Sequence, residues 1–340
     1  MTFSGGEGPG PPYTLIRGTG VGAYCSALLL NRGGVRVSLE EADRPRVPAI
    51  MIGSATQTLI EDVFGRQDLF GGLHRIDQRV VAWGPEAEPK MLPHSAIVIS
   101  ERQLADRLRP PVGNARSTAP DWTIFASRPL PPETVEHRFG SRSAKATLVQ
   151  LADQTDSATC WIESLDNGWL FLIPNSPREG WLLTVGDAPL EASRVIVPQI
   201  ASAKGVGAVA AFMACPRMVN PICDAGWLAC GTAAMAFDPI CGDGTGNAVR
   251  EAILAAAVVR APGPVEDRLA HYRMRLLSGF LRHLDQCRQF YATGGTSDWW
   301  RAEHLEILRG MNWCQTQLDT EGQYRYQLRG FDLERIAVRE

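Results

Sequence analysis

Two glycines near the start of the chain have the spacing needed to hold a phosphate group. Gly18 and Gly20 follow the apolar run 13–17, and Ala23 opens a stretch of helical character. The first glycine permits a tight turn, the second lets the backbone approach a pyrophosphate, and a small third residue lets helix and strand pack closely. The free N–H groups and positive dipole end of the helix face the phosphates in such an arrangement. The expected phosphate-binding residues are Gly18, Gly20, Val21, Gly22 and Ala23.

The elements that position these glycines occur in the order of a dinucleotide-binding βαβ unit. The helix continues through 23–30, residues 35–39 form a second strand, and an acid stands at its end. Glu41 lies 21 residues beyond Gly20, near the spacing expected for an acid that accepts hydrogen bonds from ribose hydroxyls. Glu40 is the alternative; the alternation along the strand leaves the choice open, and we prefer Glu41. An acid here favours FAD or NAD over NADP.

The bulk composition is that of a globular protein with a substantial core. The chain has 340 residues, of which 45% are hydrophobic and 21% charged, with a net charge of −3. This balance predicts neither a nucleic-acid partner nor a membrane partner. The apolar run 252–259 is too short to span a bilayer, and residues 1–12 form a flexible Gly/Pro-rich tail without the features of a secretory signal. We therefore expect a cytoplasmic protein.

The cysteines show no pattern of metal binding or of a redox motif. The chain has eight of them, without a CxxC pair or the spacing of metal ligands. They occur in apolar segments, so we expect reduced packing residues and no metal site. The missing CxxC pair also argues against a disulfide reductase.

The remaining pattern predicts an α/β fold with an inserted antiparallel sheet. Helices are expected at 54–64, at 100–108 with Ser100 as N-cap, at 245–259 and at 265–291. Strands are expected at 78–83, 96–99, 122–126, 145–151, 157–164, 168–173, 180–185 and 227–230, with a Pro-rich turn between the first two. The fold class is thus a Rossmann-like FAD-binding domain with an inserted antiparallel-sheet substrate domain and C-terminal helices.

The expected domains follow from this pattern. They are a tail at 1–12, a discontinuous FAD-binding domain at 13–70, 96–130 and 201–262, a substrate domain at 71–95 and 131–200, and a C-terminal helical region at 263–340.

A second glycine-rich segment resembles a known flavoprotein motif. Gly231 follows a buried strand, Asp238 and Pro239 come next, and the glycines of 242–246 open an apolar helix. This segment resembles the FAD-closing motif of the p-hydroxybenzoate hydroxylase superfamily. It looks most like the tryptophan-halogenase-like branch, which includes flavoproteins that mature tryptophylquinone cofactors. Supporting similarities are Ile52-Gly53, Trp83-Gly84, Arg102, Glu163, Gly168-Trp169, Pro174, Tyr272, Phe280, His283-Leu284, Phe290-Tyr291 and Trp299-Trp300.

The resemblance implies an extended FAD, with NAD(P)H as a transient reductant. The first glycine motif would hold the pyrophosphate, Glu41 the adenosine ribose, and Arg102 the ribityl-pyrophosphate side. Asp238 and Pro239 would pack by the isoalloxazine, and the backbone of 242–246 would lie beneath the pyrimidine end of that ring. Independently, a glycine turn that opens a helix supplies N–H donors suited to the N1–C2=O edge of a reduced flavin. The residues implied in this half are Arg102, Gly231, Thr232, Asp238, Pro239, Gly242, Gly244, Thr245 and Gly246. Both glycine motifs should therefore border one crevice.

Two departures from the family pattern put the strength of flavin binding in question. The family usually has Gly-Asp where this chain has Gly231-Thr232, so a carboxylate that contacts the ribityl hydroxyls is replaced by a hydroxyl. A second common motif, Asp-Ala-Thr-Gly, stands here as Phe125-Ala-Ser127-Arg128. These departures motivate the alternative of a catalytically degraded flavoprotein-like binding or maturation partner with weak or no FAD binding.

The favoured function is an FAD-dependent monooxygenase that acts through a flavin (hydro)peroxide. A halogenase needs a lysine near its substrate, and this chain has none before Lys90. The substrate would be a small aromatic molecule or a tryptophan side chain on a partner protein. The catalytic residues are unknown; the candidates are Trp83, His94 and Cys241. An NAD-linked dehydrogenase is less favoured, since no catalytic acid/base pair is evident.

Overall fold

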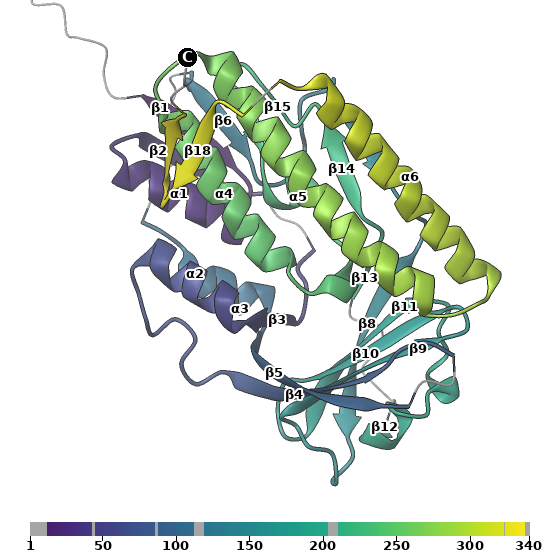
Figure 1. Ribbon diagram of the computed structural model, residues 1–340. Helices are drawn as coiled ribbons and strands as arrows, with labels where there is room; N and C mark the ends of the chain where they lie inside the picture. The colour runs from purple at the N-terminus through teal and green to yellow at the C-terminus, as the bar shows by residue number, and fades with distance from the viewer. Residues whose placement is uncertain are drawn as a thin grey trace, which may run out of the picture.

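Two sheets of different character form the framework of the protein (Figure 1). The computed structural model describes residues 12–42, 45–85, 88–111, 119–202, 210–322 and 324–336. The first sheet has the order β15 (Cys223–Asp224), β16 (Trp227–Ala229), β6 (Trp122–Phe125), β1 (Tyr13–Arg17), β2 (Arg36–Glu40). The second has the order β12 (Ile200–Ser202), β8 (Ser143–Leu151), β11 (Glu179–Gly186), β10 (Gly168–Pro174), β9 (Thr159–Leu165), β4 (His74–Ala82), β5 (Lys90–Ile99), β3 (Ile50–Gly53), and β13 (Ala210–Met213) also pairs with β8.

The described chain contains six α-helices. They are α1 (Val21–Arg32), α2 (Ser54–Phe64), α3 (Glu101–Leu108), α4 (Gly244–Arg260), α5 (Val265–Thr293) and α6 (Asp298–Thr320). Short 3₁₀ turns are η1 (Leu190–Ala192), η2 (Val197–Gln199), η3 (Gly231–Ala233) and η4 (Pro239–Cys241). Smaller sheets are formed by β7 (Val135–Arg138), β14 (Arg217–Asn220) and β17 (Met235–Ala236), and by β18 (Tyr326–Arg329) and β19 (Asp332–Arg335). None of the helices in these residues has the length and apolar character of a membrane span.

The order of the parallel strands creates a crevice at their carboxyl ends. β1 pairs in parallel with β2 on one side and with β6 on the other, and β6 pairs in parallel with β16. The connection that follows β1 therefore leads to β2 on one side of it, and a later connection leads to β6 on the other side. Loops at such a switch point diverge, which is where open α/β sheets bind ligands.

The large sheet is apolar on both faces at its centre. Every residue of β10 is buried. Phe171 lies opposite Leu183 and Ile173 lies opposite Trp181 on the face toward the helices, whereas Leu172 belongs to a separate apolar cluster on the other face. A strand covered on both faces requires the continuous apolar run seen in its sequence.

α5 and α6 form a long helical hairpin that runs from the parallel sheet toward the large sheet (Figure 1). The hairpin turn contains Gly294 and Gly295, whose backbones pack directly against the Trp300 ring, so a side chain at either position would collide with it. The Trp300 indole N–H also donates to the carbonyl of Leu165 over 2.8 Å. This contact fixes the end of the hairpin to the turn between β9 and β10.

The predicted fold class is confirmed, with the parallel sheet, the antiparallel sheet and the C-terminal helices all present, although β4 and β9 of the large sheet pair in parallel. The helix at 54–64 is confirmed, and so is the Ser100 cap, whose hydroxyl accepts from the backbone N–H of Gln103. The predicted Pro-rich turn before 96–99 is wrong in extent, since β5 already begins at Lys90. Pro93 fits this strand beside a register shift in β4, where a proline without an N–H is tolerated.

The sheets divide the residue ranges differently from the expected domains. β3 and the end of β5 lie in ranges assigned to the FAD-binding domain, yet they pair within the large sheet, as does β13. The C-terminal range contains the β18–β19 hairpin besides its helices. The sheet to which each of these strands belongs is decided by pairing with strands distant in sequence, so local sequence patterns do not reveal it. The expected tail at 1–12 lies outside the described residues except for Pro12.

Candidate functional site

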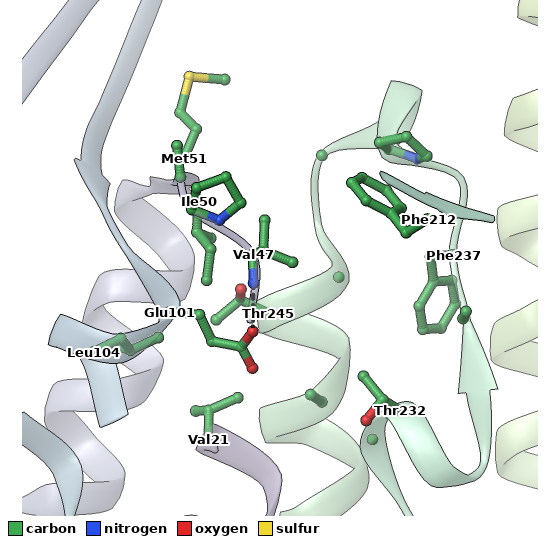
Figure 2. Close-up of a pocket in the computed structure, with 18 of the residues that line it drawn as sticks. Val21, Val47, Ile50, Met51, Glu101, Leu104, Phe212, Thr232, Phe237 and Thr245 are labelled. Atoms are coloured by element: carbon green, nitrogen blue, oxygen red, sulfur yellow. Dashed lines mark hydrogen bonds between the residues drawn. The ribbon is translucent and has the colours of Figure 1, made fainter. Parts of the chain in front are cut away.

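A cavity of about 360 Å³ lies between the carboxyl ends of the parallel strands and the large sheet. Thr19, Ala126 and Gly231 line it just after β1, β6 and β16, while Phe171 and Trp181 line it from β10 and β11. Figure 2 shows Val21, Glu101 and Leu104 on one side and Thr232, Phe212 and Phe237 on the other. The crevice expected from the strand order is therefore continuous with a space against the antiparallel sheet.

The first side of the cavity contains the amino end of α1. Gly20 caps this helix with a φ of 93°, and the first intrahelical bond runs from the Tyr24 N–H to the Gly20 carbonyl over 3.1 Å. The preceding N–H groups of the first turn have no partner within the helix, and no acid lies in that turn. Val21 and Gly22 line the cavity. Anionic groups are stabilised by such a helix end.

The turn before α1 is packed too closely to admit a side chain. Gly18 has a φ of +132°, and a Cβ there would lie 2.6 Å from the Ser127 hydroxyl. Ser127 also accepts from the Thr19 N–H over 3.4 Å. The segment that departs from the family's Asp-Ala-Thr-Gly motif thus supports the first glycine turn directly.

The amino end of α4 borders the same cavity. Gly242, Gly244 and Thr245 all line it, and no acid lies in the first turn of the helix. A Cβ at Gly244 would meet nothing within 4 Å, whereas one at Gly246 would collide with Asp243 and Thr56. The expected convergence of the two glycine motifs on one crevice is confirmed. Two helix amino ends, far apart in sequence, present N–H donors to one space.

A buried carboxyl group stands beneath the Gly231 turn. The Glu251 side chain accepts the Gly231 N–H over 2.7 Å through Oε2, while Oε1 is buried without a hydrogen-bond partner. Burial raises the pKa of Glu251 to about 8, although the Gly231 hydrogen bond opposes this shift. Glu251 lines the cavity, so a neutral acid with unused hydrogen-bonding capacity faces it.

Thr232, the residue that replaces the family's aspartate, is exposed beside this turn. Its hydroxyl donates to the Ala126 carbonyl over 3.4 Å, and it lines the cavity. Glu251 therefore provides the only carboxyl group that hydrogen-bonds to the Gly231–Ala233 turn among the described residues.

Asp238 holds the adjacent turn in place from inside the core. Its carboxylate accepts from the Arg142 guanidinium over 2.7 Å and from the Tyr291 hydroxyl over 2.9 Å. Arg142 donates to Glu303 as well, and all three charged side chains are buried. The Asp238 N–H donates to His283 Nε2 over 2.9 Å. Asp238 borders the cavity, but its carboxylate oxygens serve this network and the Ile240 N–H.

The wall of the cavity toward the large sheet is apolar and largely aromatic. Phe171, Trp181 and Phe212 contribute rings, and Phe237 adds one from the chain before η4. The charged residues among the lining side chains are Glu101, Asp238 and Glu251, and no lysine or arginine of the described chain lines it. This wall suits a flat apolar group.

Six of the expected cofactor contacts lie outside the set of lining residues, namely Gly18, Gly20, Ala23, Glu41, Arg102 and Gly246. Arg102 is exposed on α3, and its neighbour Glu101 lines the cavity and accepts the Val47 N–H over 2.9 Å (Figure 2). Glu41 pairs with Arg109 at the end of β2, whereas Glu40 pairs with Arg17. Their roles toward a cofactor stay predictions, and Glu41 stays the preferred ribose acid.

The three candidate catalytic residues are spread over different environments, and none of them lines the cavity. Trp83 packs edge-on against Trp169 and Trp300 and donates to the carbonyl of Phe290 over 3.0 Å. His94 contacts Arg79, and its pKa is lowered by burial and then by that guanidinium. Cys241 turns toward α5. Their catalytic assignment is not supported by these positions.

Sequence reasoning missed Arg142, Glu251 and the aromatic wall. Glu251 carried a signal, because a lone acid in the strongly apolar helix 245–259 needs a special environment. Phe171 and Trp181 alternate correctly along their strands, but the face they take is set by the partner strands. Arg142 had no local signal.

No family model and no curated protein matches the sequence. Solved structures do match: the chain has the FAD-monooxygenase fold shared by flavin-dependent halogenases and hydroxylases. The flavin-dependent halogenase CmlS superposes with a TM-score of 0.74 at 16% identity, over 91% of this chain and 71% of that one. The peptidyl tryptophan dihydroxylase QhpG, essential for tryptophylquinone cofactor biogenesis, gives a TM-score of 0.71 at 16% identity, over 96% and 86%.

A third structure shows the fold together with its cofactor. A variant of HpxO from Klebsiella pneumoniae, complexed with FAD, superposes with a TM-score of 0.60 at 13% identity, over 92% of this chain and 95% of that one. The resemblance inferred from the glycine motifs is thus confirmed at the level of fold.

The lining residues fit an extended FAD in three respects. Two helix amino ends supply N–H donors, the space beside Gly244 is open to a planar group, and the buried Glu251 has an oxygen without a partner. Of the three acids that line the cavity, Asp238 is paired with Arg142, Glu251 favours its neutral form, and the Glu101 carboxylate accepts from the Val47 N–H.

Proposed function

We propose that this protein is an FAD-dependent monooxygenase that acts on an aromatic group. The observation that carries the proposal is the single cavity that joins the amino ends of α1 and α4 to an aromatic wall on the large sheet. Such a cavity accommodates an elongated coenzyme at one end and a flat substrate at the other.

The residues at the two helix ends have distinct tasks in this proposal. The backbone of 20–23 binds the pyrophosphate, and the backbone of 242–246 binds the polar edge of the isoalloxazine ring. Glu251 holds the Gly231 turn and offers its second oxygen to the ribityl chain. When bound and reduced, the flavin supplies the activation of molecular oxygen.

The wall formed by Phe171, Trp181 and Phe212 would orient the substrate and exclude water. Because no basic side chain lines the cavity in the described chain, hydroxylation is favoured over halogenation, for which a lysine is needed. QhpG acts on peptidyl tryptophan, and the similarity to it supports an indole on a partner protein as the first substrate to test; a small aromatic molecule is the other.

Titration of the purified chain with FAD tests the proposal. We expect stoichiometric binding, seen as a shifted flavin spectrum and co-elution in gel filtration, and reduction of the bound flavin by NADH or NADPH. Gly244→Val should abolish binding without unfolding the protein, since its side chain would project into the open part of the cavity. Gly322→Val is the matched control, because Gly322 is exposed with open space around it. Failure of the unmodified chain to take up flavin at micromolar FAD would refute the proposal.

A second candidate function is a non-catalytic binding or maturation partner, favoured by Thr232 in place of aspartate. In that case Thr232→Asp should raise the affinity for FAD markedly, and the unmodified chain should not support flavin reduction. Reduction of flavin by NADH in the unmodified chain would exclude this candidate.

A further inference from the structure

A pair of cysteines lies between the turn that borders the cavity and helix α5. Cys241 ends η4 and Cys287 lies in α5, and their sulfur atoms are 3.7 Å apart. His283 precedes Cys287 by one helical turn, and its Nε2 atom is 3.4 Å from the Cys287 sulfur. The sequence separation of 46 residues explains why no local motif revealed this pair.

The two thiols differ in reactivity. A hydrogen bond from the Cys287 thiol lowers the pKa of Cys241 to about 6; His283 lowers it as well, while burial and Asp238 oppose the shift. Burial raises the pKa of Cys287, and Arg142 only partly counters this. Cys241 is therefore the thiol of the pair that ionises first to the nucleophilic thiolate, while Cys287 keeps its proton.

The other six cysteines of the chain all lie in the part that the structure describes. Each has a raised pKa because burial disfavours its thiolate. Cys241 is also the one cysteine of the eight that is not fully buried. A small oxidant would thus react at Cys241 before any other thiol, and a second sulfur stands within reach of it.

The neighbouring histidine does not complete a metal site. Cys241, His283 and Cys287 have their potential ligand atoms within 4.8 Å of one another. However, His283 Nε2 already accepts the Asp238 N–H over 2.9 Å, so the lone pair that a metal requires is engaged. The geometry therefore favours sulfur chemistry over metal binding.

We propose that Cys241 and Cys287 form a reversible disulfide when the protein meets hydrogen peroxide. The Cys241 thiolate attacks one peroxide oxygen, the O–O bond breaks, and the departing hydroxide takes a proton to become water. The Cys287 sulfur then attacks the sulfenic sulfur, the S–O bond breaks, and the Cys287 proton leaves with that oxygen as a second water. Two thiols are oxidised by two electrons in total, and one peroxide is reduced to two waters.

The disulfide would link η4 covalently to α5. Each sulfur has to move by less than about 1 Å to reach bonding distance, since a disulfide S–S length is about 2.05 Å. Pro239 and Gly242, which border the cavity, flank Cys241 closely, so oxidation acts on the wall of the cavity. Peroxide is also the product expected when a flavin monooxygenase activates oxygen without hydroxylating its substrate, so oxidation would restrain a site that is turning over unproductively. This last consequence rests on the proposed function; the disulfide itself does not.

Mild peroxide treatment of the full chain, followed by intact mass measurement and peptide mapping, tests the proposal. We expect the loss of two hydrogen atoms, a linked peptide that contains Cys241 and Cys287, and full reversal by dithiothreitol. In Cys287→Ser, a dimedone adduct at Cys241 should replace the linked peptide. Cys160→Ser, which removes a fully buried thiol of β9, should leave disulfide formation unchanged.

The rate of oxidation separates this pair from an ordinary thiol. Cys241 should react at pH 7 about tenfold or more faster than it does at pH 5, following its thiolate fraction. Three results would overturn the proposal: no linked peptide at any peroxide dose that leaves the protein folded, over-oxidation of Cys241 at equal rates with and without Cys287, or stoichiometric zinc retained by the purified chain at this cluster. None of these depends on whether FAD binds.

Discussion

The surroundings of Glu251 change its ordinary acid chemistry. It is fully buried in α4, its one hydrogen bond is to the Gly231 N–H, and its pKa is raised to about 8 by burial. An ionised carboxylate is costly in such a site, and a neutral acid can both donate and accept. Glu251 therefore places a neutral carboxyl group with one unpartnered oxygen beneath the Gly231 turn.

Glu251→Gln should change how stability depends on pH. A folded-state pKa near 8, above the ordinary value of 4.5, means that the folded chain holds a proton that the unfolded chain releases. The contribution of protonated Glu251 to the free energy of unfolding is complete below about pH 4.5. As the pH rises from there to about 8, this contribution falls by up to ~1.4 kcal/mol per pH unit. Glutamine does not ionise, so the free energy of unfolding of the variant should increase relative to that of the unmodified chain as the pH rises over this range.

Urea unfolding at pH 5, 7 and 9 measures this difference in the free energy of unfolding. Glu191→Gln, an exposed acid changed in the same way, should show no such trend. Parallel pH profiles for Glu251→Gln and the unmodified chain would show that Glu251 is ionised in the fold.

At the scale of elements, one buried arginine joins four segments. Arg142, just before β8, pairs with Asp238 before η4 and with Glu303 on α6, and its guanidinium lies 4.4 Å from the ring centre of Tyr291 on α5. This network determines where the η4 turn stands relative to the large sheet. Breaking it should therefore affect both stability and the shape of the cavity.

Arg142→Met should lower the free energy of unfolding by about 3–5 kcal/mol, because it removes the cationic partner of two buried carboxylates. Adding Glu303→Gln should recover part of the loss, since one of these charges is then removed. Arg301→Met, which breaks an exposed pair with Asp298, should cost less than about 1 kcal/mol. Equal losses for the two arginine variants in urea unfolding would contradict this account.

α3 offers a milder test at the same scale. Ser100 and Gln103 form a reciprocal capping box at its start, and Glu101 and Leu104 of this helix line the cavity. Ser100→Ala should reduce the free energy of unfolding by about 1 kcal/mol, whereas Ser100→Asp, which can still cap, should lose less. Thermal or urea unfolding of the two variants measures these losses. Identical losses of unfolding free energy in Ser100→Ala and Ser100→Asp would mean that the side-chain cap contributes nothing.

At the scale of the whole molecule, the cavity lies between two sheets that share one apolar core. That core contains Ile16 of the parallel sheet and Phe171 of the large sheet, together with residues of α4, α5 and α6. A ligand that touches both helix amino ends would couple these parts, and a ligand that binds only the folded state raises its stability.

FAD should accordingly raise the unfolding free energy by about 2.7 kcal/mol when its free concentration is a hundredfold above Kd. FMN lacks the adenylate half and the contacts expected at α1, so it should raise the thermal midpoint less at equal concentration. Thermal melts over a concentration series measure both effects, with Gly244→Val expected to abolish them. An equal response to FMN and FAD would show that the α1 end takes no part in binding.

The sequence by itself determined the local units of this protein. The βαβ order around Gly18 and Gly20, the glycine turn that opens α4, the helix 54–64 and the Ser100 cap were all predictable. Each depends on residues within one or two turns of the chain, where periodicity, backbone freedom and capping act directly.

Only the tertiary structure decided what those units meet. It placed both glycine motifs on one cavity, directed the Asp238 carboxylate into the core toward Arg142, and turned Cys241 toward Cys287. It also moved β3 and β13 into the large sheet. These partners are separated by tens of residues or more, and which of many chemically possible pairs forms is settled by packing the whole chain, which no local pattern encodes.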